Sequence, residues 1–307
     1  MTVAIYSHSA CIDHDPGAGH PESAARLVAV LEALADPRFA LIDRIEAPRA
    51  TRAQLARVHR AELIDKIMGN APREGCYRFD ADTVMSPDSF EAALRAAGAV
   101  CAAVDGAIAE TNQRAFCAVR PPGHHATPST AMGFCLFNNI AVGAAHAIAA
   151  HKLERVAIVD FDVHHGNGTQ DIFCNDGRVL YTSSHQSPLY PGTGARSETG
   201  VGNIVNAPLP PGAGSVEFRD VYERIVLPAL DAFGPQLVMI SAGFDAHRLD
   251  PLASLNLEAD DYAWITARLV EVADRHAHGR IVSSLEGGYS LTALRESTAA
   301  HVAALMA

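Results

Sequence analysis

Short apolar runs alternate with longer helix-like segments along the whole chain, and this alternation restricts the possible folds more than any other feature. The apolar runs are rich in β-branched residues and apolar on both faces, as is typical of strands in a covered parallel sheet. They are predicted as strands at 3–6, 115–119, 156–163, 178–182, 237–242 and 281–285. Helices are predicted at 23–35, 138–150, 216–233, 258–276 and 291–306, and a further helix is predicted to open at Ser86-Pro87 and to run to about 109.

Repeated strand–helix alternation predicts an α/β fold: one doubly wound, three-layer domain over residues 1–307 with a mainly parallel central sheet. A chain of 307 residues would suggest about two domains at ~150 residues each, but no linker, repeat or low-complexity stretch marks a boundary. Ligands of open α/β sheets bind beyond the carboxyl ends of the strands, so we expect the functional residues in the loops there.

Charge and hydropathy exclude several classes of function. The chain has 24 Lys and Arg against 35 Asp and Glu, a net charge of −11, which argues against a nucleic-acid partner because phosphate binding needs a basic surface. No apolar run approaches the ~18 residues of a membrane span, and the first residues do not resemble a signal peptide. Six scattered cysteines indicate reduced thiols. We therefore expect a cytoplasmic protein without a membrane partner.

Ionisable residues follow two of the predicted strands directly. Asp160, Asp162 and His164 end the run 156–163, and on a strand these three residues would share one face. Burying such groups without partners would cost several kcal/mol, which favours a metal site over a solvated strand end. Asp245 follows the run 237–242 and is the natural third ligand. Two carboxylates and one imidazole leave an open coordination position, which suits catalytic Zn²⁺ or Fe²⁺.

Two further motifs supply proton-transfer and hydrogen-bonding groups. Arg120-Pro121-Pro122-Gly123 precedes His124 and His125, and the rigid turn would fix the two imidazoles for proton transfer. Asp160 and Asn167 are candidates to orient them. Glu286-Gly287-Gly288 precedes Tyr289, whose hydroxyl could donate to a developing oxyanion.

The segments RPPGHHA, STAMGFCLFNN, VDFDVHHGNGTQDIF, PLYPGTG, SAGFDAH and SLEGGYSL occur in this order, and together they resemble the histone deacetylase family, specifically class II and its bacterial relatives. The resemblance covers essentially the whole chain. It implies an arginase-like α/β fold and a zinc-dependent amide hydrolase that removes acetyl groups from lysine or related amines.

The resemblance also implies residue roles. It places zinc on Asp162, His164 and Asp245. His125 would be the main proton shuttle and His124 its electrostatic partner, with Asp160 behind His124 and Asn167 behind His125. Because asparagine carries no charge, His125 should be less basic than with an aspartate partner. Tyr289 matches the tyrosine that polarises the acyl carbonyl. The remaining histidines are interpreted as structural or solvated.

The substrate tunnel and the potassium sites follow only from the resemblance. Its walls and apolar rim would be formed by Gly133, Phe134, Leu189, Tyr190 and Leu252. Asp82 matches the rim aspartate that holds the substrate backbone, with Asp80 as a competing candidate. Structural K⁺ would be held, largely by backbone oxygens, by Asp160, Asp162, His164, Ser183 and Ser184, and at a second site by Phe173 and Val179.

Three alternatives to an acyl-lysine deacylase stay open on the sequence. An acetylpolyamine or other small-amide hydrolase would use the same chemistry, although Leu252 lacks the acidic group of a polyamine gatekeeper. A catalytically silent acyl-lysine reader is disfavoured by Tyr289. A ureohydrolase like arginase would need two metals and more ligands. The oligomeric state is also open, with a homo-oligomer among the alternatives.

Overall fold

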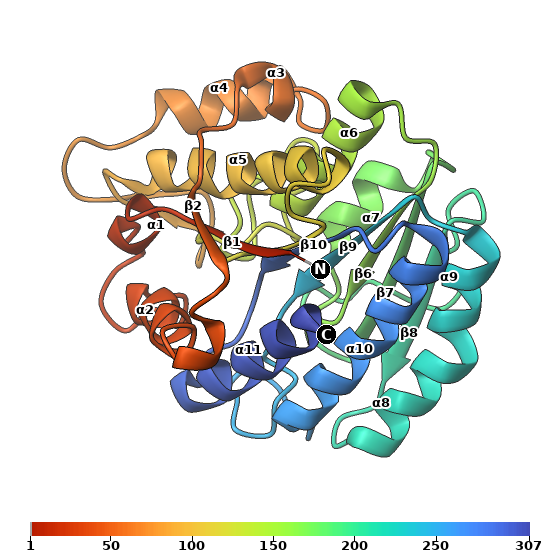
Figure 1. Cartoon of the computed structure of the whole chain (residues 1–307). Helices are drawn as coiled ribbons and strands as arrows, with labels where there is room; N and C mark the ends of the chain where they lie inside the picture. The colour runs from red at the N-terminus through yellow and green to blue at the C-terminus, as the bar shows by residue number, and fades with distance from the viewer. Residues whose placement is uncertain (1) are drawn as a thin grey trace.

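An eight-stranded sheet runs through the centre of the computed structural model, which describes residues 2–307 (Figure 1). Every neighbouring pair in this sheet is parallel. The order is β2 (Asp43–Glu46), β1 (Val3–Ser7), β5 (Arg114–Cys117), β10 (Ile281–Leu285), β9 (Leu237–Ala242), β6 (Val156–Asp160), β7 (Val179–Gln186) and β8 (Ile204–Leu209). A small antiparallel hairpin joins β3 (Tyr77–Arg78) and β4 (Val84–Met85). The mainly parallel α/β fold predicted from the sequence is confirmed.

Helices cover both faces of the sheet (Figure 1). One layer contains α3 (Arg52–Leu55), α4 (Ala61–Gly69), α5 (Ser89–Ile108), α6 (Asn139–His151) and α7 (Asn167–Phe173). The other contains α2 (Ala24–Ala33), α8 (Ser215–Val221), the π-helical segment η2 (Tyr222–Val226), α9 (Leu227–Phe233), α10 (Ala259–His276) and α11 (Leu291–Met306). The short α1 (Ala10–Asp13) lies beside α5 and α2, and a 3₁₀ turn, η1 (Pro37–Phe39), follows α2.

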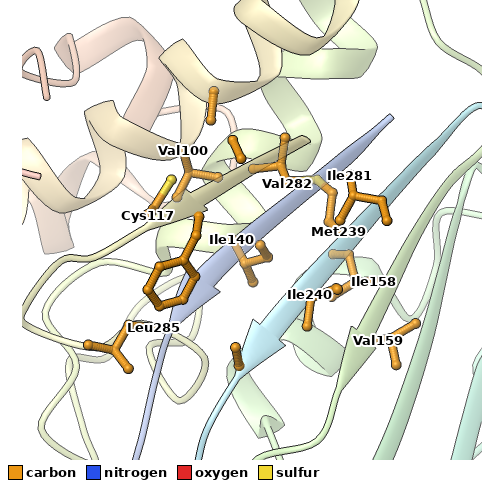
Figure 2. Close-up of a cluster of buried hydrophobic side chains, with 14 of the residues drawn as sticks. Val100, Cys117, Ile140, Ile158, Val159, Met239, Ile240, Ile281, Val282 and Leu285 are labelled. Carbon is orange, nitrogen blue, oxygen red and sulfur yellow. The ribbon is translucent and has the colours of Figure 1, made fainter. Parts of the chain in front are cut away.

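The core lies where the four middle strands meet the helices. Side chains of β10, β9 and β6 pack against α5 and α6, as Ile158, Met239 and Val282 illustrate in Figure 2. All residues of β5, β6, β9 and β10 are buried. Because these strands are covered on both sides, most of their residues are apolar, which explains why the strands could be recognised.

Two predicted boundaries are wrong, for local reasons. The helix predicted from Ser86-Pro87 begins at Ser89, because Ser86 instead contacts the Ser89 hydroxyl (2.9 Å) and accepts from the Asp15 N–H (3.0 Å) in the preceding turn. The strand predicted over 156–163 ends at Asp160. The Asp160 carboxylate accepts from the N–H of Asp162 (3.2 Å), and such side-chain turns compete with the strand ladder.

Sequence periodicity did not predict the outer strands. Three of the four residues of β2 are charged and exposed, and β8 contains Pro208, so neither has the apolar pattern of a buried strand. The segment predicted as one helix over 216–233 is continuous but contains the π-helical turn η2.

Among residues 2–307, no helix is long and apolar enough to cross a membrane.

Candidate active site

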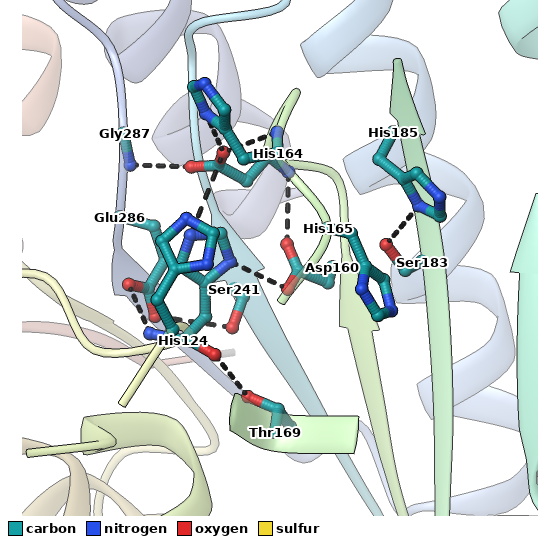
Figure 3. Close-up of polar contacts among 12 residues, drawn as sticks. His124, Asp160, His164, His165, Thr169, Ser183, His185, Ser241, Glu286 and Gly287 are labelled. Carbon is teal, nitrogen blue, oxygen red and sulfur yellow. Dashed lines mark hydrogen bonds and ion pairs between the residues drawn. The ribbon is translucent and has the colours of Figure 1, made fainter. Parts of the chain in front are cut away.

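The four middle strands bring the sequence motifs together at one edge of the sheet. β5, β10, β9 and β6 are direct neighbours, so the loops after their carboxyl ends converge although they are far apart in sequence. A cavity of about 220 Å³ opens there. Its lining includes both adjacent histidines, His164 and Tyr289. Figure 3 shows the polar contacts beneath it, centred on His124, Asp160 and Glu286.

The loop after β6 places Asp162 and His164 by carboxylate turns rather than by strand alternation. Asp160 accepts from the N–H of Asp162, and Asp162 Oδ1 accepts from the N–H of His164 at 2.9 Å. The expectation that these residues share a strand face is therefore wrong, since no strand continues past Asp160. Asp245, from the loop after β9, reaches the same place and accepts from the N–H of Val163 at 2.8 Å.

Asp162, His164 and Asp245 form a compact, buried trio whose ligand atoms all lie within 4.8 Å of one another. His164 Nδ1 is 3.2 Å from Asp162 Oδ1 and 3.1 Å from Asp245 Oδ2. Burial, and then the charge of Asp162, raises the pKa of Asp245 to about 7. Burial opposes protonation of His164, but the two carboxylates outweigh it and raise its pKa to about 10. This donor set attracts a cation and fits a metal with oxygen and nitrogen ligands.

A glycine makes the close packing of the two carboxylates possible. Gly287 donates its N–H to Asp162 Oδ2 at 2.8 Å. A Cβ at Gly287 would lie 2.1 Å from Asp245 Oδ2 and 2.6 Å from Asp162 Oδ2, so any side chain here would displace the trio. The first glycine after Glu286 is thus in contact with both carboxylates of the trio, beyond the loop flexibility predicted from the sequence.

His124 and His125 lie side by side, with ring centroids 4.0 Å apart, but have different partners. His124 Nδ1 is 3.0 Å from Asp160 Oδ2, and His125 Nδ1 is 2.8 Å from Asn167 Oδ1. Since both partner oxygens accept, each imidazole carries its proton on Nδ1. The Nε2 of a neutral His125 is then an acceptor, because its Nδ1 proton is already committed to Asn167.

The two imidazoles also differ in charge. Burial opposes the charged form of His124, yet Asp162 and Asp160 raise its pKa well above the usual value. For His125, burial and the neighbouring His124 and His164 all lower the pKa, well below the usual value. These directions make His124 the more basic imidazole of the pair and favour the neutral form of His125.

Glu286 is a further buried acid that the sequence did not single out. Its Oε2 accepts from the N–H of Gly123 (2.6 Å) and of His124 (3.1 Å), and its Oε1 accepts from the Ser241 hydroxyl (3.3 Å) (Figure 3). Burial is the main reason that its pKa rises to about 7. This carboxyl group ties the end of β10 to the turn that carries both histidines.

Tyr289 is held from two sides. Its N–H donates to Asp250 Oδ2 at 2.6 Å, and the guanidinium of Arg26 lies 4.8 Å from the centre of its ring. Arg26 also donates to the carbonyl oxygens of Gly288 (2.6 Å) and Glu286 (2.5 Å). Burial raises the pKa of Tyr289 well above its usual value, so its hydroxyl is a hydrogen-bond donor at neutral pH.

Arg26 belongs to a buried ion-pair network that fixes the position of its guanidinium. Glu22 pairs with Arg26 (2.8 Å), Arg120 (2.7 Å) and His14 (3.2 Å), and all four side chains are buried. Glu22 precedes Arg26 by one helical turn, a spacing that could have suggested the first pair. The pairing with Arg120 could not be predicted, because it joins residues 98 positions apart.

The structure brings the predicted tunnel residues to the walls and mouth of the same cavity: Gly133, Phe134, Leu189, Tyr190 and Leu252. Gly133 has a φ of +57°, and a Cβ there would lie 2.5 Å from the ring of His125. The ring of Phe134 meets Tyr289 edge-on at 5.9 Å, and Tyr190 meets His125 edge-on at 5.1 Å.

At the cavity mouth, the structure separates the two rim candidates. Asp82 lines the cavity, whereas the exposed Asp80 uses its carboxylate to accept from the N–H groups of Asp82 (3.0 Å) and Thr83 (2.6 Å). Asp80 thus forms the turn that presents Asp82. His20 donates to the Asp82 carbonyl at 2.9 Å and packs against Phe134.

The residues of the expected first potassium site lie behind the histidine pair. Asp160 and Ser183 are register partners of β6 and β7. The Ser183 hydroxyl contacts His185 Nδ1 at 2.9 Å, and the Ser184 hydroxyl contacts the Tyr222 hydroxyl at 3.0 Å. Potassium at Asp160, Asp162, His164, Ser183 and Ser184 stays a prediction. The second set, Phe173 and Val179, lies at the two ends of the turn between α7 and β7.

A second group of metal-ligand type connects α5 and α6. Asp105 Oδ1 is 2.7 Å from His146 Nε2 and 2.6 Å from His151 Nε2. The Nδ1 of His146 faces Arg57 Nη1 at 2.6 Å. Arginine only donates, so this Nδ1 is an acceptor and the His146 proton lies on Nε2 toward Asp105. The arrangement is a hydrogen-bonded chain and offers no free His146 lone pair to a metal.

Comparison with known proteins gives a consistent family match over nearly the whole chain. A model of the histone deacetylase domain matches residues 20–305. The chain is 41% identical to a histone deacetylase-like amidohydrolase from Pseudomonas aeruginosa, over 89% of this chain and 73% of that protein. It is 38% identical to a probable deacetylase from Archaeoglobus fulgidus, over 100% of this chain and 87% of the relative. The crystal structure of the HDA15 HD domain aligns with a TM-score of 0.94 and 36% identity, covering 99% of this chain and 88% of that one.

Proposed function

Since the chain belongs to the histone deacetylase family, we propose that it is a zinc-dependent amide hydrolase that removes an acetyl or other acyl group from the side-chain amine of acyl-lysine. One observation carries the proposal: the buried trio Asp162, His164 and Asp245 lies where a cavity lined by two histidines and a tyrosine ends. We further propose that residues 1–307 act as one catalytic unit.

The roles of the two histidines follow from their partners. Zinc bound by the trio would acidify a water molecule and polarise the acyl carbonyl. His125 is neutral with its Nδ1 proton donated to Asn167, so its Nε2 accepts a proton from the attacking water. It then returns this proton to the departing amine. His124 stays protonated beside Asp160 and stabilises the negative charge that develops.

Tyr289 supplies the remaining hydrogen bond. Its raised pKa keeps the phenol protonated, and its hydroxyl donates to the carbonyl oxygen as that oxygen becomes negative. Arg26 contacts the ring of Tyr289, and Asp250 accepts from its backbone N–H. These contacts fix the position of the donor before the substrate binds. The presence of this donor favours an enzyme over a silent acyl-lysine reader.

The cavity walls fit a long aliphatic chain. Phe134 and Tyr190 present aromatic surfaces, and Leu189 and Leu252 add apolar surface near the mouth. Asp82 at the rim can accept hydrogen bonds from a substrate backbone. Apolar Leu252 at the mouth favours acyl-lysine over an acetylpolyamine, which stays the alternative substrate class.

Tyr289→Phe tests the proposal. We expect turnover of an acetyl-lysine peptide to fall by about 10²- to 10³-fold, with one zinc per chain retained, because only the oxyanion donor is lost. Tyr190→Phe, which removes a hydroxyl at the mouth of the same cavity, is the matched control and should retain most activity. Wild-type turnover by Tyr289→Phe, or activity that survives complete metal removal by a chelator, would disprove the mechanism.

The same assay separates the substrate classes. Acetyl-lysine peptides, longer acyl-lysine peptides and acetylated polyamines are compared at equal concentration on zinc-loaded protein. We expect the peptides to have the higher kcat/KM. A preference for polyamines would move the assignment to the alternative, and turnover of none of them would favour the reader.

A further inference from the structure

Three backbone carbonyl oxygens converge at the end of α7, in the turn that leads into β7. They belong to Phe173, Asp176 and Val179. The side-chain nitrogen of Asn203 lies among them, with Nδ2 at 2.8, 3.1 and 2.8 Å from the three oxygens, which share its two hydrogens. Asn203 directly precedes β8 and is only 4% exposed, so it is an interior contact rather than a surface one.

The orientation of this amide is determined by its other contact. Asn203 Oδ1 accepts from the N–H of Val201 at 3.2 Å. A flipped amide would place Oδ1 against three carbonyl oxygens and Nδ2 against an N–H group, which is unfavourable at both ends. The Asn203 backbone is fixed as well, because its carbonyl accepts from the N–H of Tyr181 at 3.0 Å.

Converging backbone carbonyls are the type of ligand that replaces the hydration shell of a monovalent cation. The resemblance to the deacetylase family implies potassium on Phe173 and Val179. An ion and the Asn203 amide cannot share this position. We propose that in this protein the Asn203 amide takes the place of the second potassium ion, so that this site binds no cation and α7 is tied to β8 by the chain itself.

This anchor lies at the far end of the helix that orients His125. α7 begins at Asn167, the partner of His125, and ends at Phe173. Seven residues of helix span about 10 Å, so both ends of one short, stiff element are fixed, one by the histidine and the other by Asn203. Asn203 is a positioning residue in this scheme, and the inference does not depend on which substrate the enzyme takes.

Crystals soaked in Tl⁺, an electron-rich K⁺ analogue, provide the direct test. We expect no anomalous peak between the carbonyls of Phe173, Asp176 and Val179 in the wild type, whatever ions bind elsewhere. In Asn203→Ala the three oxygens lose their donor, and a Tl⁺ peak is expected among them. A peak at this point in the wild type would overturn the proposal, as would an empty site in the variant.

Thermal unfolding in KCl and in choline chloride of equal ionic strength gives an independent readout. In choline, Asn203→Ala should unfold about 3–6 °C below the wild type, because buried carbonyls lose their partner, and KCl should restore part of the loss. Comparing each protein with the wild type in the same salt removes the effect of ions bound at other sites. Should this variant fail to fold, Asn203→Ser is used in the same way.

Asn175→Ala is the matched control for both experiments. Asn175 is an exposed asparagine on the same turn, and its side-chain amide contacts Cys174 Sγ at 3.4 Å. It should match the wild type in both salts and take up no Tl⁺. Equal thermal unfolding midpoints for the Asn203 and Asn175 variants in both salts would refute the proposal that Asn203 anchors α7.

Discussion

His125 and its neighbour His124 have different acceptors behind them and different charges around them. Asn167 offers His125 a neutral amide oxygen, whereas Asp160 offers His124 a carboxylate. A carboxylate stabilises an imidazolium and a neutral amide does so far less. The nearby charges act in the same direction as this difference: Asp162 favours the charged form of His124, and His124 and His164 disfavour the charged form of His125.

Asn167→Asp should therefore change the pH dependence of catalysis. The new carboxylate raises the pKa of His125, and the neutral form needed as base then appears only at higher pH. We expect the acidic limb of the kcat/KM profile to move up by about one pH unit. Asn175→Asp adds the same charge on the exposed turn after α7 and should leave the profile in place. An unshifted limb in Asn167→Asp would exclude His125 as the titrating base.

Among the elements, β10 and the turn after β5 depend on each other through one side chain. The Glu286 carboxyl group accepts from two backbone N–H groups of the turn that carries both histidines. β5 and β10 are sheet neighbours although about 160 residues separate their sequences, so this contact exists only once the sheet has formed.

Glu286→Ala should loosen the turn that carries His124 and His125. Two buried N–H groups lose their acceptor, and a displacement of the histidines by even 1 Å is expected to lower kcat by about 10- to 100-fold. The zinc content should stay at one per chain, because Glu286 touches none of the three ligands. Glu286→Gln keeps the size of the side chain and one acceptor oxygen, so its kcat should lie between that of the wild type and that of Glu286→Ala. Unchanged kcat in the alanine variant would show that the turn is rigid by itself.

The ends of two elements are set by side chains that form hydrogen bonds with backbone N–H groups or with neighbouring side chains in place of regular secondary structure. β6 ends at Asp160 because carboxylates accept from the next N–H groups, and α5 begins two residues later than predicted because Ser86 contacts Ser89. The buried middle strands and the long helices followed from hydrophobic periodicity. The outer strands β2 and β8 did not, since their pairing depends on neighbours and not on their own pattern.

In the whole molecule, buried neutral histidines couple stability to pH. His301 lies between Thr266 (2.6 Å) and Ser283 (2.8 Å) and among the aromatic rings of Phe116, Phe161 and Phe244. Burial lowers its pKa to about 3. The unfolded chain, with a histidine pKa of about 6.5, binds this proton first. The stabilisation is therefore complete above pH 6.5 and is lost as the pH falls from there toward 3.

His301→Gln removes this titration. Between pH 7 and pH 5 the wild type should lose roughly 2 kcal/mol more unfolding free energy than the variant, measured by urea unfolding at each pH. His278→Gln alters an exposed histidine and should retain the wild-type slope. Parallel pH dependences for His301→Gln and the wild type would mean that His301 is accessible to protons in the folded state.

The sequence by itself determined which ionisable residues stand at the strand ends: Asp162 and His164 after one apolar run, Asp245 after another, the histidine pair after a third and Tyr289 after a fourth. These signals are local, because an apolar run and the polar residues that follow it lie within a few positions of each other. Only the tertiary structure decided how Glu286, Arg26 and Asn203 are used. Their partners are backbone groups of distant segments, and a strand order that differs from the chain order decides which of these become neighbours.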